Sequence, residues 1–442
     1  VVPLFKNAKV VNIGPSINTS GTEYGPVVTV DESLIYFTTR RKECTGGKKD
    51  KLINDYFEDI FVAERLPDGK WSKARSLGPP ICTPHHESII GISPDRTRVL
   101  IYKADKGDDG NIYEAEITQG TWGKPVKLPE PVNSPFHESS ASYGPDGKTL
   151  YFTTVAPYRG GVGGRDIWVS VRNEKGEWSY PQNLGSPVNT PGDEEGVFIH
   201  PDGRTLFFSS NGHEGMGGFD IFKSYKRDDG SWENPVNLGP PVNSPYDDVF
   251  FYLAASGDHA YFSTIREDGY GEKDIYLVYF EVKEEEKPKL TVFRGKIIDY
   301  VTGKPLEAEI EVIDNSTGEV FGKFKSTGTD GKFTITLPSG KNYGISINAK
   351  GYLFYSENLN IPAEWAFREV VKDIQLRPIK IGAVVVLRNI FFEYNSAELR
   401  PESYHELNKV LRILQDNPTV KLELSGHTDT IGGYEYNMRL SQ

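Results

Sequence analysis

Five similar segments recur along the first two thirds of the chain, and this repeat restricts the possible fold more than any other feature. Each copy has a short stretch rich in proline and asparagine; the five read NIGPSINTS, SLGPPICTP, LPEPVNSP, NLGSPVNTP and NLGPPVNSP. An acidic residue follows each stretch, and then an apolar run such as TLYFTT or TLFFSS. Each of the first four copies ends with a Gly-x-Trp sequence; the four tryptophans are Trp71, Trp122, Trp178 and Trp232, spaced by 51, 56 and 54 residues.

Each period holds four short strands separated by turns such as GPDG and HPDG, which is the unit of a β-propeller blade. The fifth copy lacks the Gly-x-Trp strand, but the chain begins with AKVVNIG, which matches the end of that strand in the other copies. The N-terminal segment is therefore predicted to complete the last blade. This closes a five-bladed propeller over residues 1–283 and leaves no open sheet edge.

The repeats resemble the PD40 (WD40-like) repeats, related to the TolB propeller, that accompany OmpA-type domains in envelope proteins of Bacteroidetes. The composition agrees with a mainly β protein, because aromatic residues make up 12% of the chain and it contains 45 glycines and 29 prolines. The net charge of −12 argues against sequence-independent nucleic-acid binding, which needs a basic face. No stretch of about 18 apolar residues predicts a transmembrane span.

Strand direction places the Pro-Val-Asn stretches and the glycine-rich loops PYRGGVGGR, GHEGMGGF and EDGYGEK on one face of the propeller. This face also receives the largest insertion, RRKECTGGKKDKLINDYFE, a basic tract in an acidic chain. Loops on rigid scaffolds often carry function. We therefore predict a partner surface there, with a long solvated loop as the alternative.

A ring of carboxylates is predicted at the start of the innermost strands. Its members are Glu23, Glu87, Glu138, Glu194 and Asp248. Five carboxylates around one axis could bind a hard cation, but they could also cap backbone amides of their own blades, and we expect this structural role. The repeated Asp59, Asp166, Asp220 and Asp274 are predicted to bond their own glycine-rich loops. We assign no metal, because His85, His86 and His137 lack recognisable ligand spacing.

Cys44 and Cys82 are the two cysteines of the chain. Cys44 lies in the insertion, and Cys82 replaces the asparagine of the crossing that leaves the first blade. Both are predicted on one face, so a disulfide between them is a possible outcome in an oxidising compartment.

A charged run, EVKEEEKPKL, ends the repeats. Beyond it, residues 290–377 alternate apolar and polar positions through six or seven strands with turns such as TDGK and PSGK, which predicts a small β-sandwich. The stretch from Gly295 to Leu306 resembles the carboxypeptidase regulatory-like domain. That resemblance implies a spacer or protein-contact module without catalysis.

Residues 381–442 are predicted as strand, turn, helix, strand, loop and helix. Pro401 and Glu402 open the first helix, in which apolar residues recur at helical spacing. FFEYNSAELRPES, GHTD and YNMRLS follow in order, and the segment resembles the first part of the α/β OmpA C-terminal, peptidoglycan-binding domain.

This resemblance implies a binding site for the diaminopimelate residue of the peptidoglycan stem peptide, whose charged groups need charged partners. Asp429 matches the acidic partner of the ligand ammonium, and Asn437 matches the helix asparagine. Further positions at the pocket edge and in the loop are Glu393, Asn395, His427 and Thr428. The family arginine that takes the ligand carboxylate would fall beyond Gln442, so we expect the domain to be incomplete here. The alternative is an ordinary turn in which Asp429 caps a helix.

These features favour a non-catalytic anchor in the periplasm, associated with the outer membrane and cell wall, which binds peptidoglycan and envelope proteins. The architecture resembles components of the type IX secretion machinery. A propeller that senses glycans or proteins is the alternative, and a propeller hydrolase ranks last because no nucleophile elbow, zinc helix motif or nucleotide loop occurs. No cofactor is predicted.

Overall fold

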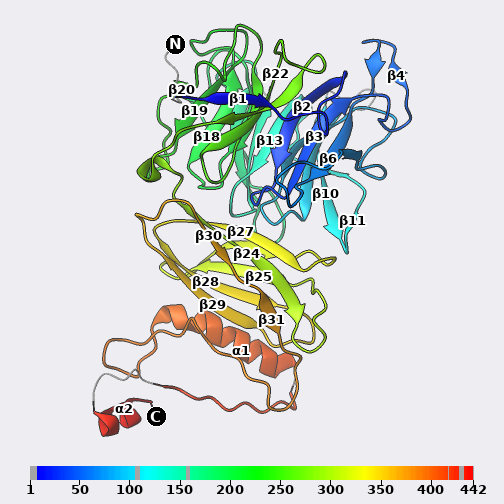
Figure 1. The fold of residues 1–442 in the computed structure, drawn as a ribbon. Helices are drawn as coiled ribbons and strands as arrows, with labels where there is room; N and C mark the ends of the chain where they lie inside the picture. Colours follow the sequence, from blue (N-terminus) through cyan, green and yellow to red (C-terminus); the bar gives the residue numbers. More distant parts are fainter. Residues whose placement is uncertain (1–6, 105–109, 156–159, 417, 428–432, 442) are drawn as a thin grey trace.

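The computed structural model describes residues 7–104, 110–155, 160–416, 418–427 and 433–441. Three parts follow one another in Figure 1: a ring of sheets, a two-sheet sandwich and a C-terminal segment with two helices. None of the described helices has the length and hydropathy to cross a bilayer. The mainly β fold predicted from the sequence is confirmed.

The N-terminal ring consists of antiparallel sheets. In the first four sheets the strand that comes first in the sequence is innermost, and in the last sheet the innermost strand is β21. The first sheet comprises β2 (Thr22–Val28), β3 (Leu34–Arg40), β6 (Asp59–Glu64) and β7 (Arg75–Ser76). The second comprises β8 (Glu87–Ile92), β9 (Arg98–Lys103), β10 (Asn111–Thr118), β11 (Thr121–Trp122) and β12 (Val126–Lys127). The third comprises β13 (Glu138–Tyr143), β14 (Thr149–Thr154), β15 (Asp166–Val171) and β16 (Gln182–Asn183).

The fourth sheet comprises β17 (Glu194–Ile199), β18 (Thr205–Ser210), β19 (Asp220–Tyr225) and β20 (Val236–Asn237). The last comprises β21 (Val249–Leu253), β22 (His259–Thr264), β23 (Asp274–Tyr279) and β1 (Lys9–Asn12). Innermost strands of neighbouring sheets contact one another around a closed circuit, from β2 through β8, β13, β17 and β21 back to β2. This circuit is the architecture of a propeller.

The N-terminal strand closes the ring. β1 pairs antiparallel with β23, and Val10 lies opposite Val278 while Val11 lies opposite Leu277. Val10 also packs, half-buried, on the apolar cluster between the last two sheets. The predicted completion of the last blade by the N-terminal segment is therefore confirmed.

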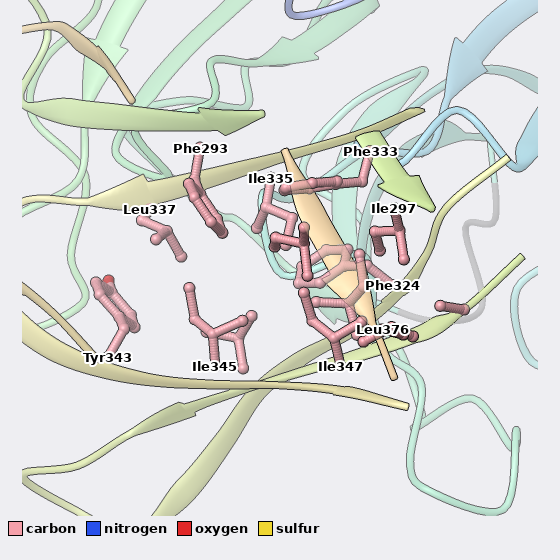
Figure 2. Close-up of a cluster of buried hydrophobic side chains, with 14 of the residues drawn as sticks. Phe293, Ile297, Phe324, Phe333, Ile335, Leu337, Tyr343, Ile345, Ile347 and Leu376 are labelled. Carbon is pink, nitrogen blue, oxygen red and sulfur yellow. The ribbon is translucent and has the colours of Figure 1, made fainter. Parts of the chain in front are cut away.

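Residues beyond the propeller form a sandwich that opens with a short 3-10 helix, η2 (Glu284–Glu286). One sheet comprises β24 (Leu290–Asp299), β27 (Lys332–Pro338), β30 (Arg368–Val371) and β31 (Ile374–Leu376). The other comprises β25 (Glu309–Asp314), β26 (Glu319–Lys325), β28 (Lys341–Asn348) and β29 (Tyr355–Ile361). Alternation along the strands sends Phe293, Ile335 and Ile345 into the core between the sheets (Figure 2).

The sandwich packs against the propeller turns opposite the glycine-rich loops. The backbone N–H of Lys325 donates to Asp95 at 3.0 Å, and its ammonium lies 2.9 Å from Glu116. Lys148 donates to the carbonyl of Val320 at 2.7 Å. A cavity of about 70 Å³ lies inside the ring, and Thr336 of β27 lines it together with residues of the innermost strands. The sandwich thus covers one end of the propeller channel.

Candidate functional site

The C-terminal segment is fixed to the sandwich through helix α1 (Tyr404–Asp416), which follows a 3-10 turn, η3 (Pro401–Ser403). Glu311 of β25 lies 3.0 Å from His405 and 3.3 Å from Lys409 of this helix. A hydrogen bond from His405 and the charge of Lys409 hold the pKa of Glu311 at about 2, against the effect of its partial burial. Figure 1 shows α1 lying along the sandwich.

A buried polar network completes this contact. Glu406 of α1 accepts hydrogen bonds from the Ser356 hydroxyl at 2.7 and 2.8 Å. Asn389 donates to Glu406 at 2.8 Å and to the carbonyl of Glu357 at 2.9 Å. Its own side-chain oxygen accepts a hydrogen bond from Asn358 at 3.0 Å. Because each of these buried groups has a partner, the network specifies one docked position for the helix. The sequence patterns did not identify these residues.

Two of the predicted peptidoglycan-site residues lie in the turn that leads to η3. Glu393 donates its backbone N–H to the carbonyl of Glu398 at 2.9 Å, and its carboxylate lies 3.9 Å from Arg400. Asn395 has a φ of 57°, a left-handed conformation that asparagine tolerates better than most residues. The side chains of Glu393 and Asn395 are exposed.

Helix α2 (Tyr434–Ser441) carries Asn437, whose backbone N–H donates to the carbonyl of Gly433 at 2.9 Å. The hydroxyl of Tyr436 donates to the side-chain oxygen of Asn395, which brings α2 next to the turn. Sequence reasoning did not single out Tyr436. His427 is exposed. Thr428 and Asp429 lie outside the described residues, so their predicted roles remain predictions.

The two strands predicted in the C-terminal segment are not formed. Residues 383–388 and 419–425 have no strand pairing, although both helices of the prediction are present. A strand needs a hydrogen-bonded neighbour, and neither stretch has one within the described part of the chain. The exposed Val384 and Leu424 agree with a stretch that lies on no sheet.

The five carboxylates of the predicted ring are buried, and each accepts hydrogen bonds from its own blade. In every blade the carboxylate accepts hydrogen bonds from the backbone N–H and the hydroxyl of a serine or threonine four residues earlier. The pairs are Thr19 with Glu23, Thr83 with Glu87, Ser134 with Glu138, Thr190 with Glu194, and Ser244 with Asp248. This geometry agrees with the interpretation in which each carboxylate caps backbone amides of its own blade. Burial raises the pKa of Glu87 and Glu194, and raises that of Asp248 to about 6.

The repeated aspartates hold the glycine-rich loops or, in the first blade, the insertion. Each accepts a hydrogen bond of 2.5–2.7 Å from a backbone N–H of its own loop; the donors are Thr45 for Asp59, Val162 for Asp166, Met216 for Asp220 and Tyr270 for Asp274. Across the described residues, no group of three or more His, Cys, Asp or Glu side chains could hold a metal ion. The hydrogen bonds of the four aspartates therefore agree with the predicted role of stabilising the turns of these loops.

The possible disulfide between Cys44 and Cys82 is wrong, because both are free thiols. Cys44 packs between the last and first blades, whereas Cys82 packs between the first and second, so the sheet of the first blade separates them. Their S–H groups face the carbonyls of Thr39 and Ile60 respectively. Burial raises the pKa of both thiols to about 12. Placement on one rim did not imply the short separation that a disulfide needs.

The C-terminal segment is similar to known proteins. Residues 391–442 match the model of the OmpA family. The chain is 39% identical over 54 residues to "Probable lipoprotein YiaD" of Escherichia coli (strain K12), covering 12% of this chain and 25% of that protein. It is 39% identical over 61 residues to "Outer membrane protein A" of Buchnera aphidicola subsp. Schizaphis graminum (strain Sg), covering 13% and 18%. The chain thus spans a quarter or less of these relatives.

Among solved structures, TolB from Acinetobacter baumannii matches with a TM-score of 0.34 at 15% identity, covering 60% of this chain and 55% of that one. A putative TolB from Agrobacterium tumefaciens matches with a TM-score of 0.36 at 18% identity, covering 74% and 96%. At its C-terminal end, over residues 391–442, the chain is similar to the OmpA family.

Proposed function

We propose that this protein is a non-catalytic anchor of the bacterial envelope. Its C-terminal segment binds peptidoglycan, and its propeller and sandwich form a scaffold that other envelope proteins contact. The observation that carries this proposal is the match of residues 391–442 to the OmpA family, since Asp429 and Asn437 fall within it. The proposed location is the periplasm, at the outer membrane and cell wall.

The proposed binding site recognises the diaminopimelate residue of the stem peptide. Asp429 pairs with the ligand ammonium, since a charge-assisted hydrogen bond is a strong way to hold it. Asn437 orients the loop or the ligand. Glu393 and Asn395 form the edge of the pocket, and His427 and Thr428 shape the loop. The contact of Tyr436 with Asn395 supports this grouping, because it links the helix that carries Asn437 to the turn.

Contacts between the parts support the scaffold role. The propeller is bonded to the sandwich through Lys325 and Lys148, and the sandwich is bonded to α1 through Glu311 and Ser356. Such contacts would hold a partner of the propeller at a defined distance from the wall. The resemblance to type IX secretion components suggests secretion subunits as partners. Their recovery with the protein from native membranes would test this.

The absence of catalysis is part of the proposal. A hydrolase built on the channel rim would need carboxylates that can reach a substrate. The ring carboxylates, Glu194 among them, are buried and hold their own crossing loops. This arrangement supports a structural role, and hydrolysis of a glycan or peptide that disappears on changing a ring carboxylate would argue against it.

Sedimentation with purified sacculi at low ionic strength tests the anchor. The full-length protein should sediment, and Asp429→Asn, which removes the charge but keeps the shape, should weaken binding at least tenfold (about 1.4 kcal/mol). Glu423→Gln is the matched control, because it removes an exposed carboxylate of the same segment outside the predicted pocket. Equal sedimentation of the wild type and Asp429→Asn, or no sedimentation of the wild type, would refute the proposal.

A further inference from the structure

The insertion in the first blade contains a short β-hairpin. β4 (Lys49–Asp50) pairs with β5 (Asp55–Tyr56), and a four-residue turn, residues 51–54, joins them. Figure 1 shows β4 standing out from the propeller on the side away from the sandwich and the C-terminal segment. The tip of this hairpin is therefore held clear of the rest of the molecule.

The hairpin is tied to the propeller through His86. Its Nε2 lies 3.2 Å from Asp50 of the hairpin, and its Nδ1 accepts a hydrogen bond from the backbone N–H of Glu58 at 3.3 Å. The ring of Phe57 lies 4.8 Å from the His86 ring, centre to centre. Asp50 also accepts a hydrogen bond from the backbone N–H of Leu52. These contacts fix the direction in which the tip points.

The tip presents apolar side chains to water. Leu52 is 93% exposed and Ile53 is 46% exposed. Three lysines flank them, Lys48, Lys49 and Lys51, and all three are exposed. The ammonium of Lys49 lies over the ring of Tyr56, 5.2 Å from its centre. An apolar point surrounded by lysines, with an aromatic ring just behind it, is the composition of segments that sit at a lipid surface.

We propose that this hairpin tip, residues 48–56, docks on a membrane surface with anionic headgroups. Leu52 and Ile53 enter the headgroup boundary, the lysines pair with lipid phosphates, and Tyr56 lies at the level of the headgroups. A stable protein partner would need about 800 Å² on each side, far more than two protruding side chains offer. A lipid surface deforms around a tip, so it needs no matching pocket.

The overall negative charge of the protein does not oppose this contact. Charges more than a Debye length away, about 8 Å at physiological ionic strength, are largely screened. Within residues 48–56 three lysines accompany two aspartates, which leaves a net charge of +1. Asp50 is engaged by His86 and the backbone N–H of Leu52, and Asp55 accepts a hydrogen bond from the backbone N–H of Tyr56. The local charge at the tip is positive, and it governs attraction to an anionic surface.

Co-sedimentation with vesicles tests the proposal. The full chain should bind vesicles of phosphatidylethanolamine and phosphatidylglycerol (7:3) and release them as salt rises. The double variant Leu52→Ser, Ile53→Ser should lower the partition coefficient at least tenfold. Val126→Ser is the matched control, because Val126 is 68% exposed but lies on the outer edge of another blade; it should bind like the wild type.

Charge is tested separately. Each change of Lys48, Lys49 or Lys51 to glutamine should weaken binding to these vesicles about fivefold, which corresponds to about 1 kcal/mol per lysine, and should leave the weaker binding to pure phosphatidylcholine unchanged. The proposal is overturned if the wild type ignores anionic vesicles, or if the serine double variant binds them equally well. The result does not depend on binding to sacculi.

A third measurement reports insertion directly. An environment-sensitive fluorophore on Leu52→Cys should shift its emission to the blue on anionic vesicles, while the same label on Ile265→Cys, at another exposed site of the propeller, should not. Cys44 and Cys82 are buried, so labelling should favour the introduced thiol. An unshifted label on Leu52→Cys in a sample that binds the vesicles would exclude insertion of the tip.

Discussion

At the scale of single residues, several ionisable side chains of the propeller are kept charged although they are largely buried. His259 lies 2.6 Å from both Asp258 and Glu32. Burial opposes its charge, but the hydrogen bonds to Asp258 and Glu32 raise its pKa to about 9. The hydroxyl of Tyr261 also donates to Glu32 at 2.6 Å. The group joins the last blade to the first.

This pKa makes stability depend on pH. Since the folded pKa of His259 exceeds the unfolded value of about 6.5, its contribution is complete below about pH 6.5 and is lost as pH rises through 9. His259→Gln should lower the free energy of unfolding by roughly 2 kcal/mol at pH 6 and change it little at pH 9.5. Urea unfolding monitored by tryptophan fluorescence measures this, because five of the six tryptophans lie in the propeller. A loss that is equal at both pH values would contradict the assignment.

The capping carboxylates lead to a second prediction at this scale. Glu194 holds the backbone N–H and hydroxyl of Thr190 and the hydroxyl of Ser210. Glu194→Ala should destabilise the propeller by roughly 2–4 kcal/mol, because buried donors lose their acceptor. Glu194→Gln keeps one acceptor oxygen and should cost less. The same urea titration applies, and equal costs for the two variants would show that the acceptor is unimportant.

At the scale of elements, the closing strand β1 is the piece on which the ring depends. Proline in place of Val11, which pairs with Leu277, removes a backbone donor and should detach the strand. The uncovered edge of β23 should then pair with other molecules. Val11→Thr keeps the backbone N–H and serves as control. Light scattering should show concentration-dependent oligomers for Val11→Pro alone, and a monomeric Val11→Pro of normal stability would contradict this role.

Much of the element pattern was predictable because it depends on local sequence. Alternating runs, Pro-Asp-Gly turns and the repeat spacing predicted the strands of the blades, and the truncated fifth copy predicted the pairing of β1 with β23. The C-terminal strands were predicted in error, since apolar alternation in residues 419–425 cannot reveal whether a neighbour is present to pair with it. The docking of α1 through Glu406 and Asn389 depends on residues far apart in sequence, which no spacing rule connects.

In the candidate site, too, the features that depend on local sequence were predictable and the contacts between distant residues were not. Sequence motifs located the turn with Asn395 and the helix with Asn437, but the contact of Tyr436 with Asn395 depends on how α2 folds back. For the cysteines, the order of the loops gave the correct rim but not the intervening sheet, which keeps Cys44 and Cys82 in separate cores.

At the scale of the whole molecule, the sandwich links the propeller to the C-terminal segment. Lys325 bridges to Asp95 and Glu116 of the propeller. Lys325→Glu places like charges together and should loosen this contact, which small-angle scattering would detect as a larger radius of gyration with unchanged propeller stability. Lys304→Glu, an exposed charge reversal in a sandwich turn, is the matched control. A radius of gyration that stays the same in both variants would mean that other contacts hold the two parts together.

The position of β23 has a mechanical consequence. The chain leaves this strand directly for the sandwich, so a pull on the C-terminal end reaches the propeller at Tyr279. β23 is hydrogen-bonded to β22 on one edge and to β1 on the other. Tension along the strand would load both ladders in shear, and many bonds would have to yield together. Because β1 supplies one of these two ladders, the last blade would resist a pulling force better than a blade whose outer edge is unpaired.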